Sequence, residues 1–318
     1  MTAGPRGRDV RERFEVEDVS GWPASHHEDL GSKAKVWLRS PSGQKWLFKY
    51  ARREDDQAED WPEKAAAELA VALGIPAATV ALADRSGHRG VISLDVAQGW
   101  TLEHGNELLY ARDPSYQLHL PRPDQGYTLD AVREILTTPA CSTPPGWVLP
   151  SWSAYDVFAG YLVLDALIAN QDRHHENWGV LLDEATGRRA LAPSFDHASS
   201  LGFMLTDAER RERLTTNDQG RSVSHWAARG RSHFEGRPGL VALARDALAS
   251  CSSHAAAVWL DRLRETTTEV WDTILSRLPK SRVSDPARIF ASEVLTVNRG
   301  RLLDACDDLR GRDAGFPG

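Results

Sequence analysis

The sequence predicts an α+β protein of two lobes: a small N-terminal lobe built from a β-sheet with one helix, and a larger, mostly helical C-terminal lobe. Two observations predict this division. Short apolar runs separated by turn residues fill residues 36–96, whereas apolar residues recur at helical spacing in the final third of the chain. A chain of 318 residues is also long enough to bury the cores of two such units.

The N-terminal lobe is predicted from four strands and one helix. Each strand is an apolar run bounded by turn residues, and the four runs are 36–38, 45–50, 77–83 and 90–96. The turn Ser40-Pro41-Ser42-Gly43 joins the first two strands into a hairpin. Pro62 favours the first turn of a helix over residues 63–73, and Gly74 with Pro76 ends that helix.

From Trp100 onward the sequence predicts helices with long connections. The segment 112–150 contains seven prolines and is predicted to be irregular apart from one short helix. The predicted helices, which share a spacing of about 3.6 residues between apolar positions, cover residues 129–136, 155–170, 240–249, 255–278 and 285–309.

The charge balance and the cysteines exclude several classes of protein. With 38 basic and 45 acidic residues the net charge is −7, so we expect neither direct nucleic-acid binding nor attraction to anionic membranes. Three widely spaced cysteines form no disulfide framework and no zinc motif. The N-terminus lacks the apolar core of a secretory signal, and the longest apolar segment, 157–169, is too short to span a bilayer. We therefore expect a soluble cytoplasmic protein with no membrane partner.

A polar motif directly follows the helix predicted over residues 155–170. Asp172 is followed by Asn177 five residues later, and by Asp196 after a strand-like run. A phosphotransferase needs such a set: one carboxylate deprotonates the attacking hydroxyl, while an amide oxygen and a second carboxylate hold Mg²⁺, or Mn²⁺, against the phosphates of ATP. A single loop aspartate is most often only a solvated carboxylate. The ordered trio favours Asp172 as the catalytic base and Asn177 and Asp196 as metal ligands.

One lysine of the N-terminal lobe has the chemistry to bind the phosphates of ATP. Lys49 ends an apolar strand, where its ammonium group can reach the α- and β-phosphates while a carboxylate of the next helix holds it in place. Glu63, in the first turn of that helix, is our choice of partner. Glu68 stays open, because it lies five residues further along the helix and faces a somewhat different direction.

The loop ahead of the first predicted strand is the candidate to cover the phosphates. It contains Gly31, Ser32, Lys33 and Lys35, whose backbone amides and two ammonium groups suit an anionic ligand. The loop has neither a Gly-x-Gly-x-x-Gly nor a Walker sequence. Taken alone, such a segment is more often a solvated basic turn.

His174 and His175 favour a different interpretation, in which they bind a metal together with Asp172 and Asp196 in a hydrolase. Imidazole suits zinc, iron or nickel better than magnesium. Neither a third histidine at helical spacing nor a cysteine pair supports this interpretation, and it leaves Lys49 without a role. His174 is better explained as a packed histidine that shapes the loop.

Taken in order, these motifs resemble those of the HipA-like kinases. The Asp-Arg-His-x-x-Asn form is also similar to that of the phosphatidylinositol kinases, which share the same fold superfamily. The resemblance covers most of the chain, and its matching residues are Gly31-x-x-x-Lys35, Lys49, Glu63, Gly74-Ile75-Pro76, Asn170-x-Asp172-x-His174-x-x-Asn177 and the run from Leu191 to Ser199.

The resemblance implies a two-lobed protein-kinase-like fold and the transfer of phosphate from ATP, with Mg²⁺, to a serine or threonine hydroxyl. By position it implies the same roles for the five residues: Asp172 as base, Asn177 and Asp196 as metal ligands, and Lys49 with Glu63 as the phosphate-binding pair.

On this basis we divide the chain into three parts. Residues 1–13, rich in arginine and glycine, are predicted to be disordered. Residues 14–99 form the expected nucleotide-binding lobe and residues 100–318 the expected catalytic lobe, with Gly99 as a hinge between them.

The acceptor and the partners stay open at the level of sequence. A protein kinase is favoured, but a small-molecule or lipid kinase on the same fold, and a pseudokinase that only binds nucleotide, are alternatives. The resemblance also implies an antitoxin-like partner. The segment 203–237 is predicted to be a mobile loop that binds the acceptor, and its seven arginines against five acids favour an acidic or phosphate-bearing acceptor. Autophosphorylation is expected at Ser32, or else at Ser40 or Ser42.

Overall fold

The computed structural model describes residues 12–28, 35–51, 57–120, 125–138, 140–147 and 151–311. In these residues, two β-sheets and ten α-helices form the α+β arrangement that the sequence predicts. Most of the segment 1–13 lies outside the described residues, as do Gly31, Ser32 and Lys33 of the predicted phosphate loop.

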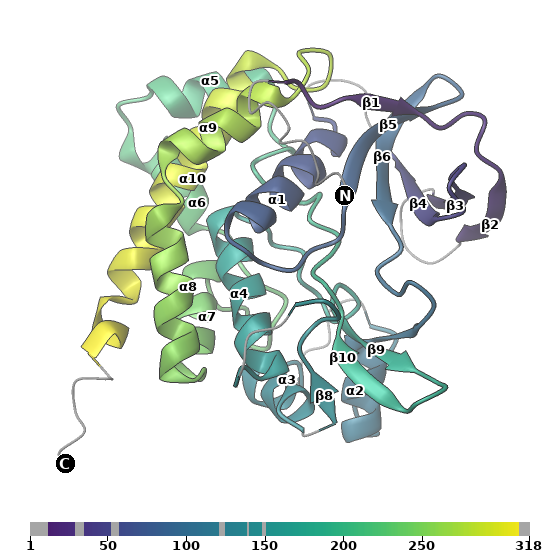
Figure 1. The fold of residues 1–318 in the computed structure, drawn as a ribbon. Helices are drawn as coiled ribbons and strands as arrows, with labels where there is room; N and C mark the ends of the chain where they lie inside the picture. The colour runs from purple at the N-terminus through teal and green to yellow at the C-terminus, as the bar shows by residue number, and fades with distance from the viewer. Residues whose placement is uncertain are drawn as a thin grey trace, which may run out of the picture.

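A six-stranded sheet forms the N-terminal part of the fold, with the strand order β1-β5-β6-β4-β3-β2 (Figure 1). Its strands are β1 (Val16–Asp18), β2 (Ala24–Glu28), β3 (Lys35–Arg39), β4 (Lys45–Tyr50), β5 (Val80–Arg85) and β6 (His88–Leu94). The predicted hairpin is present as β3 and β4. Strands β1 and β2 were not predicted, because their sequences, Val-Glu-Asp and Ala-Ser-His-His-Glu, are largely polar.

The turn between β5 and β6 is shorter than the sequence analysis expected. Strands were predicted at 77–83 and 90–96, but β5 extends to Arg85 and β6 begins at His88. The polar residues on either side of the turn therefore pair within the β5–β6 hairpin. Ser86 and Gly87 alone form the turn, with φ of 52° and 82°. A two-residue turn with positive φ at both positions matches the twist of an antiparallel pair, so the hairpin stays paired up to its tip.

Helix α1 (Asp60–Ala72) lies between the six-stranded sheet and the helices that follow (Figure 1). It contacts β5 and β6 on one side and α9 on the other. Pro62 lies in its first turn as predicted, and Gly74 follows its last turn with a φ of 65°. A side chain at Gly74 would also meet the guanidinium group of Arg262, which donates to the Gly74 carbonyl oxygen.

A second sheet follows, with the strand order β7-β9-β10-β8. Its strands are β7 (Thr101–His104), β8 (Cys141–Ser142), β9 (Gly179–Asp183) and β10 (Arg188–Leu191). The hairpin of β9 and β10 separates the loop that contains Asp172 from the loop that contains Asp196. The chain passes from the first sheet to the second between Leu94 and Thr101, near the boundary predicted between residues 99 and 100. The division into two independent lobes stays a prediction.

The remaining helices belong to the second part of the fold. They are α2 (Gly105–Arg112), α3 (Leu129–Leu136), α4 (Ala154–Leu167), α5 (Asp207–Thr215), α6 (Val223–Ala228), α7 (Leu240–Ala249), α8 (Ser253–Glu265), α9 (Thr268–Arg277) and α10 (Asp285–Ala305), with the short 3₁₀ segments η1 (Gln219–Arg221) and η2 (Asp307–Gly311). None of these described helices is long and apolar enough to cross a bilayer.

Two predictions in this part were wrong. The single helix expected over 255–278 is two helices, because Thr266 donates its hydroxyl to the Arg262 carbonyl oxygen and Thr267 is the N-cap residue of α9. The segment 203–237 is not a loop without regular structure, since it contains α5, η1 and α6. Helix α5 is largely polar and α6 has only six residues, so the apolar periodicity of both is too weak to predict them.

Helix α4 is the centre of the core, and all of its residues are buried. A helix that is apolar on every side must be surrounded by protein, and α3, α7, α8 and α10 contact it. Ser153 and Asp156 form a capping box at its N-terminus, which fixes where the helix begins. Gly160 lets the indole of Trp259 approach closely, because a Cβ there would lie 2.4 Å from Trp259 Cζ2.

Asp60 links the first sheet to the last helices. Its carboxylate accepts hydrogen bonds from Arg89 Nη2 of β6 at 2.7 Å and from Arg282 Nη1, just before α10, at 3.0 Å. Arg282 also pairs with Asp84, whose side chain is half-exposed, at 2.7 Å, whereas the charged groups of Asp60, Arg89 and Arg282 are largely buried. The network fixes the first turn of α1, which also carries Glu63.

We predict that Asp60→Ala lowers the free energy of unfolding by about 3–5 kcal/mol, because it leaves two buried guanidinium groups with too little negative charge. Urea denaturation followed by circular dichroism measures this. Glu134→Ala is the control, since its pair with Arg112 is exposed and should contribute no more than about 1 kcal/mol. Equal losses in the two variants would show that the Asp60 network does not hold the fold.

Candidate active site

Lys49 lies at the centre of a buried ionic triad. Its ammonium group is 2.6 Å from Glu63 Oε1 and 3.0 Å from Asp196 Oδ1, and the lysine is only 6% exposed. Burial alone would lower the pKa of Lys49, but the charges of Asp196 and Glu63 outweigh burial and raise this pKa above its ordinary value. Lys49 is therefore a fixed cation at neutral pH.

The two carboxylates left open as partners of Lys49 have different neighbours. Glu63 is buried against Lys49, whereas Glu68 pairs with Lys64 one turn away on the same helix. Lys64 also donates to the Val80 carbonyl oxygen of β5 at 2.8 Å, which directs that pair away from Lys49.

Asp172 lies in the loop between α4 and β9, with a half-exposed carboxylate. Ser199 Oγ donates to its Oδ2 at 3.2 Å, and His233 Nε2 lies 3.6 Å from its Oδ1. The loop is closed by the Asn177 side chain, whose Nδ2 donates to the Asp172 carbonyl oxygen at 2.7 Å. The carboxylate is thus oriented by two side chains and still reaches solvent, as a base acting on an incoming hydroxyl must.

A buried ion pair between Asp165 and Arg173 fixes this loop. Arg173 donates to both carboxylate oxygens of Asp165, from Nε at 2.8 Å and from Nη2 at 2.9 Å. The same guanidinium group binds the Asn177 carbonyl oxygen at 2.5 Å and Ser194 Oγ at 3.0 Å. One side chain from the loop therefore connects the last turns of α4, the segment after Asp172 and the segment before Asp196.

The segment that carries Asp196 is connected to this network through Ser194 and Phe195, which both bind Arg173. Ser194 Oγ lies 2.7 Å from His197 Nε2, and burial together with the Arg173 charge lowers the pKa of His197 well below its ordinary value, so that the ring is neutral. Asp196 itself has a φ of 59°, a left-handed conformation that aspartate tolerates better than most residues. Ser194 also pairs with the segment after α1, because its carbonyl oxygen accepts from the Ala78 amide at 2.8 Å.

Asn177 and Asp196 fit a magnesium ion by the chemistry of their donor atoms. The Asn177 amide nitrogen is used inside the loop, which leaves its Oδ1 as the atom that can bind a cation. A carboxylate oxygen and an amide oxygen are hard ligands of the kind that Mg²⁺ and Mn²⁺ take. Arg173 donates to the carbonyl oxygens of Asn177 and of Phe195, next to Asp196, and so links the two segments that carry these residues.

The histidines of the loop do not form the metal group that the hydrolase interpretation requires. Within the described residues, the group of three or more His, Cys, Asp and Glu side chains that lie close enough to share an ion is His174, His175 and Glu176, without Asp172 or Asp196. His175 is fully buried, its Nδ1 lies 2.7 Å from the Tyr116 hydroxyl, and burial followed by the charges of neighbouring histidines lowers its pKa to about 4. His174 packs against the rings of His175 and His233.

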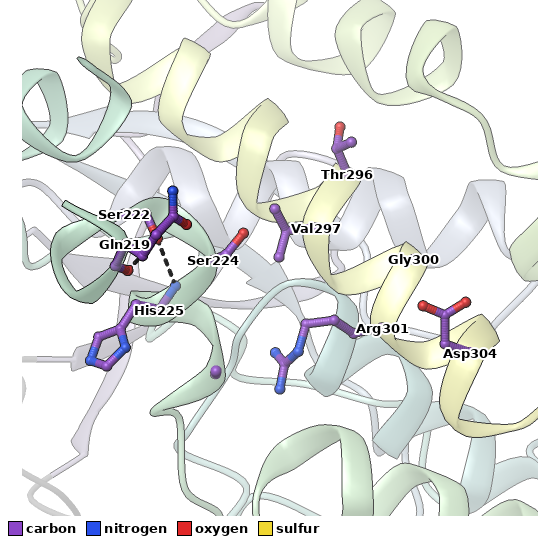
Figure 2. A pocket seen from close by; sticks show the side chains of 10 residues that line it. Gln219, Ser222, Ser224, His225, Thr296, Val297, Gly300, Arg301 and Asp304 are labelled. Carbon is purple, nitrogen blue, oxygen red and sulfur yellow. Dashed lines mark hydrogen bonds between the residues drawn. The ribbon is translucent and has the colours of Figure 1, made fainter. Parts of the chain in front are cut away.

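A separate hollow of about 560 Å³ lies between α6 and α10 (Figure 2). Ser224 and His225 come from α6, and Arg301 and Asp304 from α10. Neither Lys49 nor Asp172 lines this hollow, so the cluster of predicted site residues lies apart from it.

The comparisons with known proteins place this geometry in a family. The sequence profile of the HipA-like C-terminal domain matches residues 29–271, which is most of the chain. The chain belongs to this family. The predicted HipA-like kinase resemblance is thereby confirmed. Among curated proteins no sequence matches it.

Two solved structures show the same fold. The proinflammatory kinase CtkA of Helicobacter pylori superposes with a TM-score of 0.69 at 16% identity, over 93% of this chain and 98% of that one. HipA of Shewanella oneidensis, solved with HipB and its operator DNA, superposes with a TM-score of 0.55 at 11% identity, over 92% of this chain and 69% of that one. The predicted protein-kinase-like fold class is therefore confirmed, and this fold supports a phosphotransferase in general terms.

Sequence reasoning did not predict the residues that position the site. The sequence analysis gave no role to Asp165, and it included Arg173, Ser194 and His197 only as parts of the motifs that carry the family resemblance. A charged residue in a helix that is otherwise apolar on all sides indicates a buried partner. That observation points to Asp165, but it does not identify Arg173.

We predict that Asp165→Asn lowers the free energy of unfolding by about 3–5 kcal/mol, because it keeps the shape of the side chain while leaving the Arg173 charge buried and unpaired. Chemical denaturation measures the loss. Asp130→Asn removes a carboxylate from an exposed pair with Arg133 and should change stability by less than about 1 kcal/mol. A small effect for Asp165→Asn would mean that the loop does not depend on this ion pair.

Proposed function

We propose that this protein is an ATP- and Mg²⁺-dependent kinase that phosphorylates a serine or threonine hydroxyl of a protein. The observation that carries the proposal is the convergence of the Lys49, Glu63 and Asp196 triad with the loop of Asp172 and Asn177. These residues come from α1, β4 and two loops of the second part of the fold, so their assembly requires the whole kinase-like fold.

In the proposed reaction the residues of the chain position charge rather than form covalent bonds. Lys49, held by Glu63, would bind the α- and β-phosphates, and Asn177 with Asp196 would hold Mg²⁺. When bound, the ion would supply positive charge next to the phosphate oxygens. Asp172 accepts the proton of the acceptor hydroxyl as that oxygen bonds to phosphorus and the bond to the β-phosphate oxygen breaks. ADP leaves, and Ser199 with His233 keeps the carboxylate of Asp172 oriented.

The contact between Lys49 and Asp196 suggests how the site changes when ATP binds. At 3.0 Å, the ammonium group and the carboxylate now neutralise each other. A phosphate group next to Lys49 would take the place of Asp196, and Asp196 would turn to the metal. Glu63 would keep Lys49 in position throughout, because it is buried behind it.

Incubation with γ-labelled ATP and a cell lysate tests the proposal and its alternatives. Label on a protein supports the protein kinase, and label on a lipid or small molecule supports another acceptor on the same fold. Label on the chain itself would identify the autophosphorylation site. Nucleotide binding without any transfer would support a pseudokinase. An antitoxin-like partner, which the co-structure of the Shewanella HipA with HipB makes worth testing, would appear as a protein that co-purifies with the chain.

We predict that Asp172→Ala lowers the rate of phosphotransfer at least a thousandfold, while ATP affinity stays within about twofold of wild type. The reason is that Asp172 acts on the acceptor hydroxyl and not on the nucleotide, so its loss removes stabilisation in the transition state only. Initial rates with labelled ATP and nucleotide titrations measure the two effects. Turnover within about tenfold of wild type would exclude Asp172 as the base.

We predict that Asp196→Asn abolishes most of the stabilisation that Mg²⁺ adds in the presence of ATP. A ligand that binds only the folded state raises stability by about 2.7 kcal/mol at a hundred times its Kd, so the wild-type melting temperature should rise with MgATP. The variant should respond to MgATP no more than to ATP alone. Stabilisation and activity with Zn²⁺ but not with Mg²⁺ would favour the hydrolase instead.

A further inference from the structure

The seven arginines of residues 203–237 fall into two structural groups. Four of them have partners within the same segment. Arg210 is buried and pairs with Asp207 at 2.8 Å, and Arg211 lies 3.9 Å from the same carboxylate. Arg213 donates to the Arg221 carbonyl oxygen, and Arg221 pairs with Glu212. These four stabilise α5 and its connection to α6, so they explain part of the positive charge of this segment without any ligand.

The other three arginines are Arg229, Arg231 and Arg237, and all three are exposed. Within the part of the chain that the structure describes, none of them forms an ion pair with a carboxylate. Arg229 is the C-cap residue of α6, and Arg231 Nη1 donates only to the carbonyl oxygens of Ala228 and Gly230. A structural network of arginine–carboxylate pairs therefore does not account for them.

Arg231 and Arg237 belong to a segment that contacts the loop of the proposed base, and Arg229 lies two residues before Arg231 in the same segment. The Arg231 amide donates to Gln171 Oε1 at 3.2 Å, one residue before Asp172. Two residues after Arg231, the His233 ring reaches Asp172. The segment after Arg237 lies beside the segment of Arg231. The Ser232 amide donates to the Pro238 carbonyl oxygen, and Arg231 and Gly239 form an antiparallel β-bridge. An extended acceptor spans about 10–14 Å in three or four residues, so the residues that flank its hydroxyl would reach this surface.

The positive charge of residues 229–237 favours a negatively charged partner. The acid among residues 229–237 is Glu235, and its Oε2 accepts from the Gly126 amide at 2.7 Å. Guanidinium groups bind carboxylates through paired hydrogen bonds, and they do so even where an ammonium group would remain hydrated. The chain as a whole carries −7, so a cationic surface here is a local property and not the electrostatic footprint of a nucleic-acid-binding protein.

We propose that Arg229, Arg231 and Arg237 form a docking surface for an acidic peptide segment, which brings a serine or threonine flanked by aspartates and glutamates to Asp172. This inference rests on the proposed kinase function and adds the class of protein acceptor. The surface would contribute to binding of the acceptor and not to binding of ATP, because in the proposed function the phosphates bind Lys49 of the first sheet, which Glu63 of α1 holds in place.

The hollow between α6 and α10 is the competing place for an acceptor to dock (Figure 2). It contains one guanidinium group, that of Arg301, and one carboxylate, that of Asp304, so it carries no net charge from these two side chains. It offers no selection for an acidic segment. Substitution of Arg301 therefore distinguishes the two sites.

The test measures binding separately from catalysis. Fluorescence anisotropy gives the Kd of two labelled peptides that share one serine, flanked by aspartates in one and by asparagines in the other. We expect the aspartate peptide to bind at least tenfold more tightly to the wild-type protein and to lose that advantage as salt rises. The triple variant Arg229→Glu, Arg231→Glu, Arg237→Glu should abolish the difference, while its Kd for ATP stays unchanged.

Two single variants are matched controls. Arg211→Glu reverses an exposed charge in the same segment but on α5, and Arg301→Gln removes the cation of the hollow; both should retain the preference. Equal affinity for the two peptides, a triple variant that still prefers aspartate, or loss of the preference in Arg301→Gln would each overturn the docking surface. So would a single-stranded oligonucleotide that binds more tightly than the aspartate peptide. Tight binding of that peptide without transfer of phosphate would contradict the kinase function instead and leave the surface in place.

Discussion

The rest of the site depends on the ion pairs that the ammonium group of Lys49 forms with Glu63 and Asp196. This group is buried between Glu63 of α1 and Asp196 of the loop after β10, and so it joins the first sheet to the second part of the fold. A buried cation is stable only if its charge is neutralised, and here two carboxylates from distant parts of the sequence do this. The Asp60 network fixes α1 and therefore Glu63, and the pairing of Ser194 with Ala78 fixes the segment before Asp196. The two carboxylates thus fix the position of the Lys49 ammonium group, which is the positive charge that a phosphate can bind.

The pair of Asp165 and Arg173 has the corresponding role for the proposed base and metal ligands. It lies entirely inside the protein, and Arg173 uses its remaining hydrogen bonds on the backbone of Asn177 and on Ser194. The loops that carry Asp172, Asn177 and Asp196 are therefore linked to each other by one guanidinium group, in addition to the hydrogen bonds within the Asp172 loop. This arrangement leaves the carboxylate of Asp172 half-exposed, so that an acceptor can approach it, and Ser199 and His233 are the side chains that contact it within the described residues. Loops supported in this way combine an accessible site with fixed geometry.

Several helices and one hairpin could be predicted from the sequence, because apolar spacing and turn residues act locally along the chain. Helices α3 and α7 begin and end where the sequence predicted, and the hairpin of β3 and β4 is present. Patterns failed where tertiary contacts decide the structure. Strands β1 and β2 are polar and exist only by pairing with their neighbours, and the break between α8 and α9 depends on the hydroxyl of Thr266. For the site, residue type and order indicated Lys49, Asp172, Asn177 and Asp196, and they favoured Glu63 as the partner of Lys49 without excluding Glu68. No spacing rule could pair Asp165 with Arg173.

The most direct test of the account is the affinity of the protein for MgATP with and without the Lys49 charge. Equilibrium titration of wild type and Lys49→Met with a fluorescent ATP analogue and Mg²⁺ measures it, with circular dichroism to establish that the variant is folded. A hydrogen bond to a charged group contributes about 1.5–3 kcal/mol, so we predict a Kd at least about tenfold higher in the variant. A folded Lys49→Met protein that binds MgATP as tightly as wild type would contradict the central claim that this buried cation binds the phosphates.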